Sequence, residues 1–460
     1  MKSDTIAAIA TAMSHSGIGI IRVSGEESIK IVDSIYRNKN NLKSLQKYKT
    51  NTIHYGFICD DENILDEVMV SVMKKPNSFT TEDTVEINCH GGILVMNRIL
   101  ELVIKNGARL AQPGEFTKRA FLNGRIDLSK AEAVMDIISS KNDTALKSSV
   151  KQLRGSVYEK INDLRKAIIY DIAFIESALD DPEHISLDGY PQELSIKIAD
   201  LINDVDKLLS TAENGKMITE GINTVIVGKP NAGKSSLLNI LAGEEKAIVT
   251  DIAGTTRDIL EENIILHGIN LHVIDTAGIR STEDIIEKIG VEKAKKYSQD
   301  ADLIIYVVDS SVPLDENDYD IINMIQNKKC IILFNKSDLI SKVSLEEIKN
   351  LLDKNVIIIK TSTKENTGIE DFEDAVKKLF FNGEIYFEDE IMITNLRHKE
   401  ALQETLESLI QVKKSLEAGM PEDFYSIDLM NAYSSLGKII GEEVSDDLVN
   451  EIFSKFCMGK

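Results

Sequence analysis

A glycine-rich stretch near the middle of the chain, GKPNAGKS at residues 228–235, constrains the fold more than any other feature. The run before it, 223–227, is short, apolar and rich in β-branched residues, which predicts a buried strand. The run after it, 236–241, begins a helix. Strand, glycine loop and helix are the context in which GxxxxGK[ST] forms a phosphate-binding loop. A glycine turn that binds nothing is the alternative, and the flanking pattern argues against it.

Each fixed letter of this pattern has a physical task at a phosphate chain. Gly228 and Gly233 let consecutive backbone N–H groups point inward, and the following helix adds its positive N-terminal end. Lys234 can reach the β and γ phosphates, and the Ser235 hydroxyl can ligate Mg²⁺. The sequence therefore predicts a nucleoside triphosphate site here.

Charge limits what else the chain can bind. The 460 residues carry a formal charge of −22, which argues against a protein that holds nucleic acid on its own. Residues 1–120 hold 15 Lys and Arg against 14 Asp and Glu, whereas the rest holds 38 against 61. We therefore expect any surface for a polyanion on the N-terminal part or on a partner.

The scattered cysteines Cys59, Cys89, Cys330 and Cys457 form no CxxC pair, which predicts reduced thiols in a cytoplasmic protein. No apolar run reaches the 18 or so residues of a membrane helix, and the N-terminus lacks a signal-peptide pattern. Cys457 could be a nucleophile or redox thiol, or a small apolar residue that places the C-terminal tail, and we favour the second.

Periodicity and composition divide the chain into four parts of a multidomain α/β and α+β protein. We expect an α+β domain at 1–120, a first helical part at 121–216, a mainly parallel α/β nucleotide domain at 217–384, and a second helical part at 385–460 ending in FCMGK. Residues 215–221 are expected to be a linker. In the first domain, Ile93, Met96, Leu100 and Ile104 are expected on the buried face of a helix. We expect the two helical parts to pack together as one bundle, with the nucleotide domain inserted between them in sequence.

Two tetrapeptides downstream of the loop each follow an apolar strand. DTAG at 275–278 places a carboxylate near Mg²⁺ and a glycine N–H near the γ-phosphate. NKSD at 335–338 places a carboxylate that can accept N–H groups of guanine, which adenine lacks in that arrangement. The phosphate loop followed by these two tetrapeptides, in this order, indicates that the nucleotide is GTP.

A further loop, GTTRD at 254–258, lies where GTPases keep a switch segment, and Thr256 can join the Mg²⁺ shell. Many small GTPases place a water-orienting glutamine directly after the DTAG glycine, but this chain has Ile279 there, so another group must act. Glu283, Asp284 and Glu287 are the acidic candidates just downstream, although by themselves such residues more often form a solvated helix face.

The N-terminal part contains three polar clusters, 78–83, 90–92 and 112–117, which from physics alone indicate turns and helix caps. Together with the GTPase motifs they carry a resemblance. PNSFTTEDTVEINCHGG at 76–92, QPGEFTKRAFLNGRIDL at 112–128 and the final FCMGK resemble the MnmE (TrmE) family of tRNA-modifying GTPases, within the TrmE-Era-EngA-like group. The likeness covers the full length.

The resemblance implies a tetrahydrofolate-binding-like N-terminal domain that mediates a homodimer, a helical domain and an inserted Ras-like GTPase domain. It implies a conformational switch: GTP hydrolysis would drive the nucleotide domains of the dimer together and apart, and this motion would be needed for the modification. It also implies that the protein acts with an FAD-containing partner, MnmG (GidA), in a heterotetramer or larger assembly. Together they would add an aminomethyl or carboxymethylaminomethyl group to C5 of wobble uridine 34 of tRNA. The carbon would come from 5,10-methylene- or 5-formyl-tetrahydrofolate, FAD would sit on the partner only, and the partner would hold most of the tRNA.

Carried onto this chain, the resemblance implies a K⁺ site at Asn231 and at the backbone of Thr250, Ile252 and Thr255. It implies that Glu287 positions the attacking water beside Lys234 and Gly278. It implies folate contacts at Arg22, Glu82, Arg125 and Lys460, where Arg125 replaces the usual lysine. With the motifs above, the expected nucleotide and metal residues are Asn231, Ala232, Gly233, Lys234, Ser235, Ser236, Thr250, Asp251, Ile252, Ala253, Gly254, Thr255, Thr256, Asp275, Thr276, Ala277, Gly278, Asn335, Lys336, Asp338, Ser362 and Thr363.

Two other functions fit parts of the pattern. A ribosome-assembly GTPase would need a Lys- and Arg-rich RNA-binding appendage, which this sequence lacks. A folate-dependent tRNA methyltransferase regulated by GTP would alter tRNA without the partner.

Overall fold

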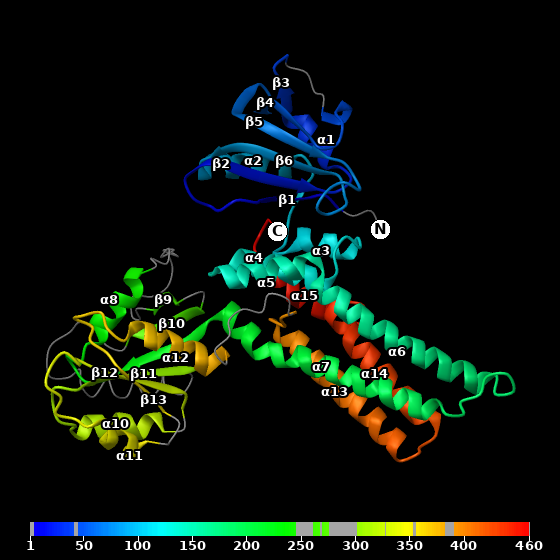
Figure 1. Cartoon of the computed structure of the whole chain (residues 1–460). Helices are drawn as coiled ribbons and strands as arrows, with labels where there is room; N and C mark the ends of the chain where they lie inside the picture. Colours follow the sequence, from blue (N-terminus) through cyan, green and yellow to red (C-terminus); the bar gives the residue numbers. More distant parts are fainter. Residues whose placement is uncertain are drawn as a thin grey trace. The chain divides into compact units, whose positions relative to one another are not determined.

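A computed structural model describes residues 4–40, 45–244, 261–266, 269–275, 301–326, 328–352, 356–381 and 391–459 (Figure 1). Tertiary contacts divide the chain into two compact units. The first contains residues 1–135, 151–195 and 408–460, and the second contains residues 136–150 and 196–407. None of the described helices is long and apolar enough to cross a membrane.

The first unit is built on a seven-stranded, mostly antiparallel sheet of order β3-β4-β5-β6-β2-β1-β7. Its strands are β1 (Ile6–Ile9), β2 (Ser16–Ser24), β3 (Tyr36–Asn38), β4 (Thr52–Asp60), β5 (Asn63–Met73), β6 (Thr84–Gly91) and β7 (Arg109–Leu110). Helices α1 (Ser28–Ile35) and α2 (Ile93–Lys105) and the 3₁₀ turn η1 (Leu45–Lys47) complete the domain. Alternation along the strands turns Val68, Val70 and Val72 of β5 into the core.

Helix α2 forms as expected, but its buried face differs from the prediction. The buried residues are Met96, Ile99, Leu102 and Val103, while the predicted Ile104 is exposed. Met96 belongs to both the predicted and the observed set, and the other buried residues lie on a neighbouring face of the helix. The i, i+3, i+6, i+7 series keeps to one face, because 3.6 residues make a turn.

The rest of this unit is helical. It contains α3 (Glu115–Leu122), most of α4 (Leu128–Ser139), the end of α5 (Asp143–Arg154), α6 (Ser156–Asp180), the start of α7 (Tyr190–Glu220), the end of α13 (Leu396–Glu417), α14 (Glu422–Ile440) and α15 (Asp446–Ser454). Helices α6 and α14 pack along one another (Figure 1). Between them the Arg165 guanidinium lies 4.1 Å from the Tyr433 ring centroid and pairs with Glu442. A helix before the nucleotide domain therefore packs against one after it, as the sequence predicts.

The second unit contains a six-stranded sheet of order β13-β12-β11-β8-β10-β9, in which only β9 is antiparallel. Its strands are β8 (Ile222–Val227), β9 (Glu261–Leu266), β10 (Ile269–Asp275), β11 (Leu303–Asp309), β12 (Cys330–Asn335) and β13 (Ile357–Lys360). Helices α8 (Lys234–Glu244), α10 (Glu316–Ile325), α11 (Leu345–Leu351) and α12 (Ile369–Phe381) accompany them. Strand β8 lies between β10 and β11, so the strands that follow it in sequence are placed on both sides of it. Its carboxyl end is the switch point at which such sheets bind ligands.

The expected linker at 215–221 is wrong, because helix α7 continues through these positions to Glu220. Gly215 is inside the helix, where a Cβ would lie 2.2 Å from the carbonyl oxygen of Ile393. Its glycine therefore permits a close backbone approach and does not mark a flexible segment. Gly221, with φ at 84°, ends the helix directly before β8. Ile218 of α7 belongs to the same hydrophobic core as Ile222 of β8.

Candidate functional site

The loop between β8 and α8 has the backbone that a phosphate cradle needs. Gly228 has φ at 150° and Gly233 at 107°, and Asn231 between them is left-handed with φ at 61°. A Cβ at Gly228 would lie 2.4 Å from the Val307 carbonyl oxygen, and one at Gly233 would lie 2.1 Å from Nδ2 of Asn335. Only glycine fits at these two positions, as the pattern predicts.

Lys234 begins helix α8 and folds back over the loop. Its Nζ donates to the carbonyl oxygens of Gly228 at 2.6 Å and of Lys229 at 2.7 Å. These bonds hold the ammonium group above the cradle, where it can reach the β and γ phosphates. Ser235 and Ser236 are exposed on the first turn of the same helix.

Ion pairs between Lys229 and two carboxylates also hold the loop. Nζ of Lys229 lies 2.6 Å from Oδ2 of Asp318 and 3.0 Å from Oδ2 of Asp315, on and just before α10. Burial lowers the pKa of Lys229, but these two carboxylates outweigh it and raise the pKa above its usual value. The ammonium group therefore stays charged and fixes the loop.

Asn335, the last residue of β12, joins the phosphate loop to the base-binding end of the site. Its fully buried side chain donates from Nδ2 to the Ala232 carbonyl oxygen at 2.8 Å. Its Oδ1 accepts the backbone N–H of Thr363 at 3.1 Å. The asparagine thus acts as a brace between two loops.

The carboxylate expected to read guanine is oriented by a neighbouring hydroxyl. Ser362 Oγ donates to Oδ1 of Asp338 at 2.7 Å and accepts the N–H of Glu365. Lys336, left-handed with φ at 60°, donates from Nζ to Oδ2 of Asp309 at 2.6 Å. The structure therefore brings Asn335, Lys336, Asp338, Ser362 and Thr363 to one end of the sheet, where the sequence places them.

Asp309 is a site residue that the sequence reading missed. It ends β11 beside Asn335 of β12, with which it is in register. Burial raises the pKa of this carboxyl, but hydrogen bonds from Lys336 and Ser311 outweigh it and hold the pKa below its usual value. Its position at a strand end, like those of Asp275 and Asn335, was the available signal.

Several predicted residues lie outside the described part of the chain: 250–256, 276–278, Glu287 and Lys460. Asp275 ends β10 and is in register with Ile226 of β8, two residues before Gly228. The backbone of Asp275 and the exposed Ser235 therefore border the cradle from two elements. Hydroxyl and carboxylate oxygens are the ligands Mg²⁺ prefers, so this pair of residue types fits that ion.

A second polar cluster lies in the first unit, where the two ends of the chain meet. Arg22 on β2 donates from Nε to Oε1 of Glu86 at 2.8 Å and from Nη1 to the Gly459 carbonyl oxygen at 3.0 Å. The N–H of Gly114 donates to the Cys457 carbonyl oxygen at 3.3 Å. A Cβ at Gly459, where φ is 85°, would lie 2.4 Å from the Ile9 carbonyl oxygen. The C-terminal segment therefore docks closely beside Arg22.

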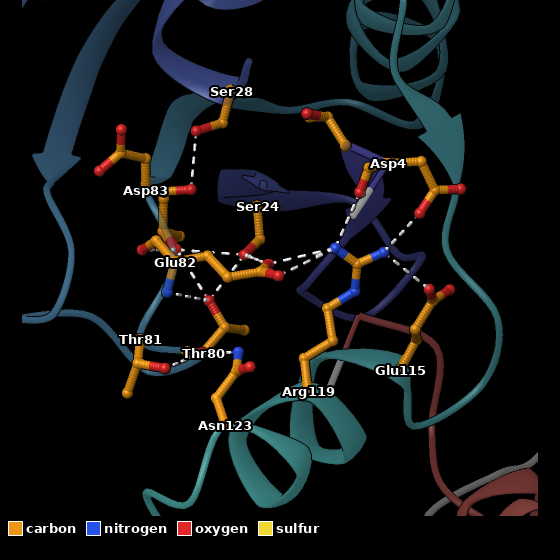
Figure 2. Close-up of polar contacts among 12 residues, drawn as sticks. Asp4, Ser24, Ser28, Thr80, Thr81, Glu82, Asp83, Glu115, Arg119 and Asn123 are labelled. Atoms are coloured by element: carbon orange, nitrogen blue, oxygen red, sulfur yellow. Dashed lines mark hydrogen bonds and ion pairs between the residues drawn. The ribbon is translucent and has the colours of Figure 1, made fainter. Parts of the chain in front are cut away.

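Glu82 is held by side chains from β2 and α3 (Figure 2). Its Oε2 accepts the Ser24 hydroxyl at 2.9 Å and Nη1 of Arg119 at 3.1 Å. Arg119, buried on α3, also donates from Nη2 to Asp4 at 2.9 Å and to Glu115 at 3.0 Å. The sequence reading missed Arg119, although its i, i+4 spacing from Glu115 was a usable signal.

Arg125 lies at the exposed rim of the cluster. Its Nη1 donates to the Phe79 carbonyl oxygen at 2.8 Å, and its guanidinium lies 4.9 Å from the centroid of the Phe79 ring. The polar segment 78–83 thus forms turns, as predicted. It also carries Glu82 and binds Arg125 through Phe79.

The sheet order, the glycine cradle and the oriented Asp338 define a P-loop GTPase. Two family models match the chain: the GTP-binding protein TrmE N-terminus at residues 5–125, and the MnmE helical domain at residues 128–457. The chain belongs to the MnmE family of tRNA modification GTPases, and it is an enzyme that hydrolyses GTP.

Individual relatives support this assignment. A tRNA modification GTPase MnmE of Lachnoclostridium phytofermentans is 56% identical over 460 residues, with 100% of both chains covered. Those of Acetivibrio thermocellus and Clostridioides difficile are 50% and 48% identical, covering 100% and 99% of each chain. Among solved structures, the G domain of the T. maritima FeoB iron transporter is 27% identical over 34% of this chain and 98% of that one, with a TM-score of 0.27. The assignment rests on the full-length relatives.

Proposed function

We propose that this protein is a potassium-stimulated GTPase that works with an FAD-containing partner, MnmG (GidA), on wobble uridine 34 of tRNA. It would act as a conformational switch in which GTP hydrolysis drives the modification. The pair would install an aminomethyl or carboxymethylaminomethyl group at C5, using a one-carbon unit from a tetrahydrofolate. The observation that carries the proposal is the contact between Arg22 and Gly459. It joins residues 437 positions apart and builds a second polar site in a chain that already has a GTP site.

The N-terminal cluster has the chemistry to hold a folate. A reduced pterin offers N–H donors, which the oriented carboxylate of Glu82 can accept, and the folate tail offers carboxylates, which the exposed Arg125 can bind in a forked geometry. Arg22 and Lys460 would add positive charge. When bound, a methylene- or formyl-tetrahydrofolate supplies the one-carbon unit. The chain's own residues orient it, and we assign them no step in the carbon transfer.

Potassium stimulation is proposed from Asn231. Asn231 is left-handed and exposed within the phosphate loop, and its side chain carries an amide oxygen that can ligate a cation. With the backbone oxygens of Thr250, Ile252 and Thr255 it would complete a monovalent cation site. Such a cation offsets charge that develops between the β and γ phosphates, where other GTPases use an arginine.

Glu287 is proposed to position the attacking water. Ile279 cannot orient a nucleophile, because its side chain has no polar atom. Glu287 supplies a carboxylate nearby in sequence, while Lys234 and the N–H of Gly278 stabilise the transferred phosphoryl group.

We propose that the protein is a cytoplasmic homodimer that joins MnmG in a heterotetramer or larger complex. Its N-terminal sheet offers a surface for the second copy, because Ile53, Tyr55 and Met69 are exposed on the face opposite α1 and α2, with Tyr55 and Met69 directly paired. An exposed apolar sheet face favours association. The partner would hold most of the tRNA.

Reconstitution tests the proposal. Purified protein, GTP, K⁺, methylene-tetrahydrofolate, a nitrogen donor and unmodified tRNA are incubated with and without the FAD partner. Nucleosides are then identified by mass spectrometry. We expect modified uridine 34 only in the presence of the partner. Product without it would favour a GTP-regulated methyltransferase, and a requirement for ribosomal RNA would favour a ribosome-assembly GTPase.

A further inference from the structure

Positive charge is concentrated in one segment of this acidic protein. Residues 34–59 contain five Lys and Arg and no Asp or Glu, in a chain whose net charge is −22. One of the five, Lys43, lies outside the described residues. Lys74 and Lys75 lie elsewhere in sequence, after β5. The fold brings these two segments together.

The antiparallel sheet explains how they meet. β3 ends, β4 begins and β5 ends at the same end of the sheet, because β4 runs opposite to both neighbours. Lys39 follows β3, Lys49 precedes β4, and Lys74 follows β5. The basic row, as we name it, consists of Arg37, Lys39, Lys47, Lys49, Lys74 and Lys75.

Hydrogen bonds fix the two segments against each other. The N–H of Lys74 donates to the Thr50 hydroxyl at 2.8 Å, and Nζ of Lys74 donates to the Gln46 carbonyl oxygen at 3.1 Å. The N–H of Asn51 donates to the Val72 carbonyl oxygen at 2.8 Å. The lysines therefore stand on a backbone held in place on both sides.

The charges of the row are available to a ligand. Lys39, Lys47, Lys49 and Lys75 are exposed, and within the described ranges no ion pair is recorded for any of the four. The acidic groups that flank the row are engaged with backbone: Asp33 accepts the N–H of Leu45, and Asp83 accepts the N–H of Lys75. With six basic side chains against these two carboxylates, the row keeps a net positive charge.

The same end of the sheet carries the polar cluster around Glu82, where the folate is proposed to bind. β6 begins there, since Met73 at the end of β5 pairs with Thr84, and Glu82 lies two residues before Thr84. At about 4.8 Å between neighbouring strands, β4 and β6 are separated by roughly 10 Å. A polyanion lying on the row would thus extend toward the site where the one-carbon unit is expected.

We propose that the basic row binds the phosphate backbone of tRNA and directs the anticodon arm toward the Glu82 cluster. This deepens the proposed function and rests on it for the identity of the RNA. Lysine ammonium groups bind phosphates as point charges and read no sequence, so the row would serve different tRNAs alike. It would supplement the main tRNA contact on the partner.

The test uses the full-length protein without the partner and measures tRNA affinity by fluorescence anisotropy across salt concentrations. The variant combines Lys47→Gln, Lys49→Gln and Lys75→Gln. Its control combines Lys166→Gln, Lys207→Gln and Lys349→Gln, which remove the same charge from other exposed positions. Far-UV circular dichroism and urea unfolding of both variants show that each is folded, and GTP turnover is measured alongside.

We expect the row variant to bind tRNA roughly tenfold or more weakly and its plot of log affinity against log salt to flatten by about 2 to 3, since each phosphate contact contributes about 0.9. GTP turnover should match that of the control. Affinity and slope equal to the control, no measurable tRNA binding by the wild type, or tighter binding to phosphatidylserine vesicles than to tRNA would each overturn the proposal. A different result would reject the proposed function and keep the basic row as a tRNA-binding surface: the row variant loses tRNA binding, but the reconstitution with the wild-type protein yields no modified uridine.

Discussion

The side-chain amide of Asn335 donates to the carbonyl oxygen of Ala232 at 2.8 Å, which ties the guanine end of the site to the phosphate loop. Because Asn335 is fully buried, removing its side chain leaves the Thr363 N–H and the Ala232 carbonyl oxygen without this partner. Each of these hydrogen bonds contributes about 0.5–1.5 kcal/mol net. Base recognition and phosphate recognition are therefore expected to weaken together.

Asn335→Ala should raise the dissociation constant for GTP by roughly tenfold to a hundredfold, on the energies of two lost hydrogen bonds. Titration with a fluorescent GTP analogue measures this. Asn239→Ala, on the exposed side of α8, is the control and should bind like the wild type. Equal affinity in the two variants would show that Asn335 is no brace.

Two glycines, one directly before helix α8 and one within it, should respond in opposite ways to alanine. Gly233→Ala should abolish GTP binding, because its φ is 107° and the new Cβ would lie 2.1 Å from Nδ2 of Asn335. Gly243→Ala should leave binding unchanged and raise the free energy of unfolding by up to about 1 kcal/mol, since nothing lies within 4 Å of its Cβ position and alanine favours helix. Nucleotide titration and urea unfolding check the pair. GTP binding by Gly233→Ala would contradict the cradle geometry.

Potassium should raise GTP turnover markedly over sodium, and Asn231→Gly should remove that stimulation. Glycine keeps the left-handed backbone at this position and removes the side chain with its amide oxygen, so GTP affinity should stay near that of the wild type. Steady-state turnover in matched KCl and NaCl measures the effect. Stimulation that persists in Asn231→Gly would place the cation elsewhere.

Glu287→Ala should lose most turnover while keeping GTP affinity, because its proposed role is to position water and not to bind the nucleotide. Turnover is measured together with a binding titration in the same potassium buffer. Weakened GTP binding would show that Glu287 has another role.

Acid should destabilise the N-terminal cluster through its carboxylates. A hydrogen bond from Arg109 is the main cause that lowers the pKa of Asp4. Burial raises the pKa of Glu115, but bonds from Arg109, the Gln112 N–H and Arg119 outweigh it and lower that pKa as well. Groups with depressed folded-state pKa values stabilise the fold above their ordinary values of 3.8 and 4.5, and this stabilisation is lost as the pH falls through the lower folded values.

The urea midpoint should therefore fall as the pH drops from 6 to 3, and it should fall less in Arg109→Ala than in the wild type. Arg98→Ala, on the exposed face of α2, is the control and should follow the wild type. Parallel curves for Arg109→Ala and the wild type would exclude this linkage.

Local patterns in the sequence were enough to predict the phosphate loop, the strand ends that carry DTAG and NKSD, and the packing of helices from both sides of the nucleotide domain. They misjudged Gly215, because a glycine that admits a neighbouring backbone looks the same in sequence as one that ends a helix. Arg119 and Asp309 were missed because their importance depends on partners distant in sequence, Glu82 and Lys336. The basic row likewise required the strand register, which joins residues 47–49 to 74–75.

Nucleoside analysis of the complete reaction, run with GTP and in parallel with a non-hydrolysable GTP analogue, tests most directly whether hydrolysis drives the modification. Both arms contain the FAD partner, K⁺, methylene-tetrahydrofolate, the nitrogen donor and unmodified tRNA. We predict modified uridine 34 with GTP and none with the analogue. Equal yields in the two arms would contradict the account.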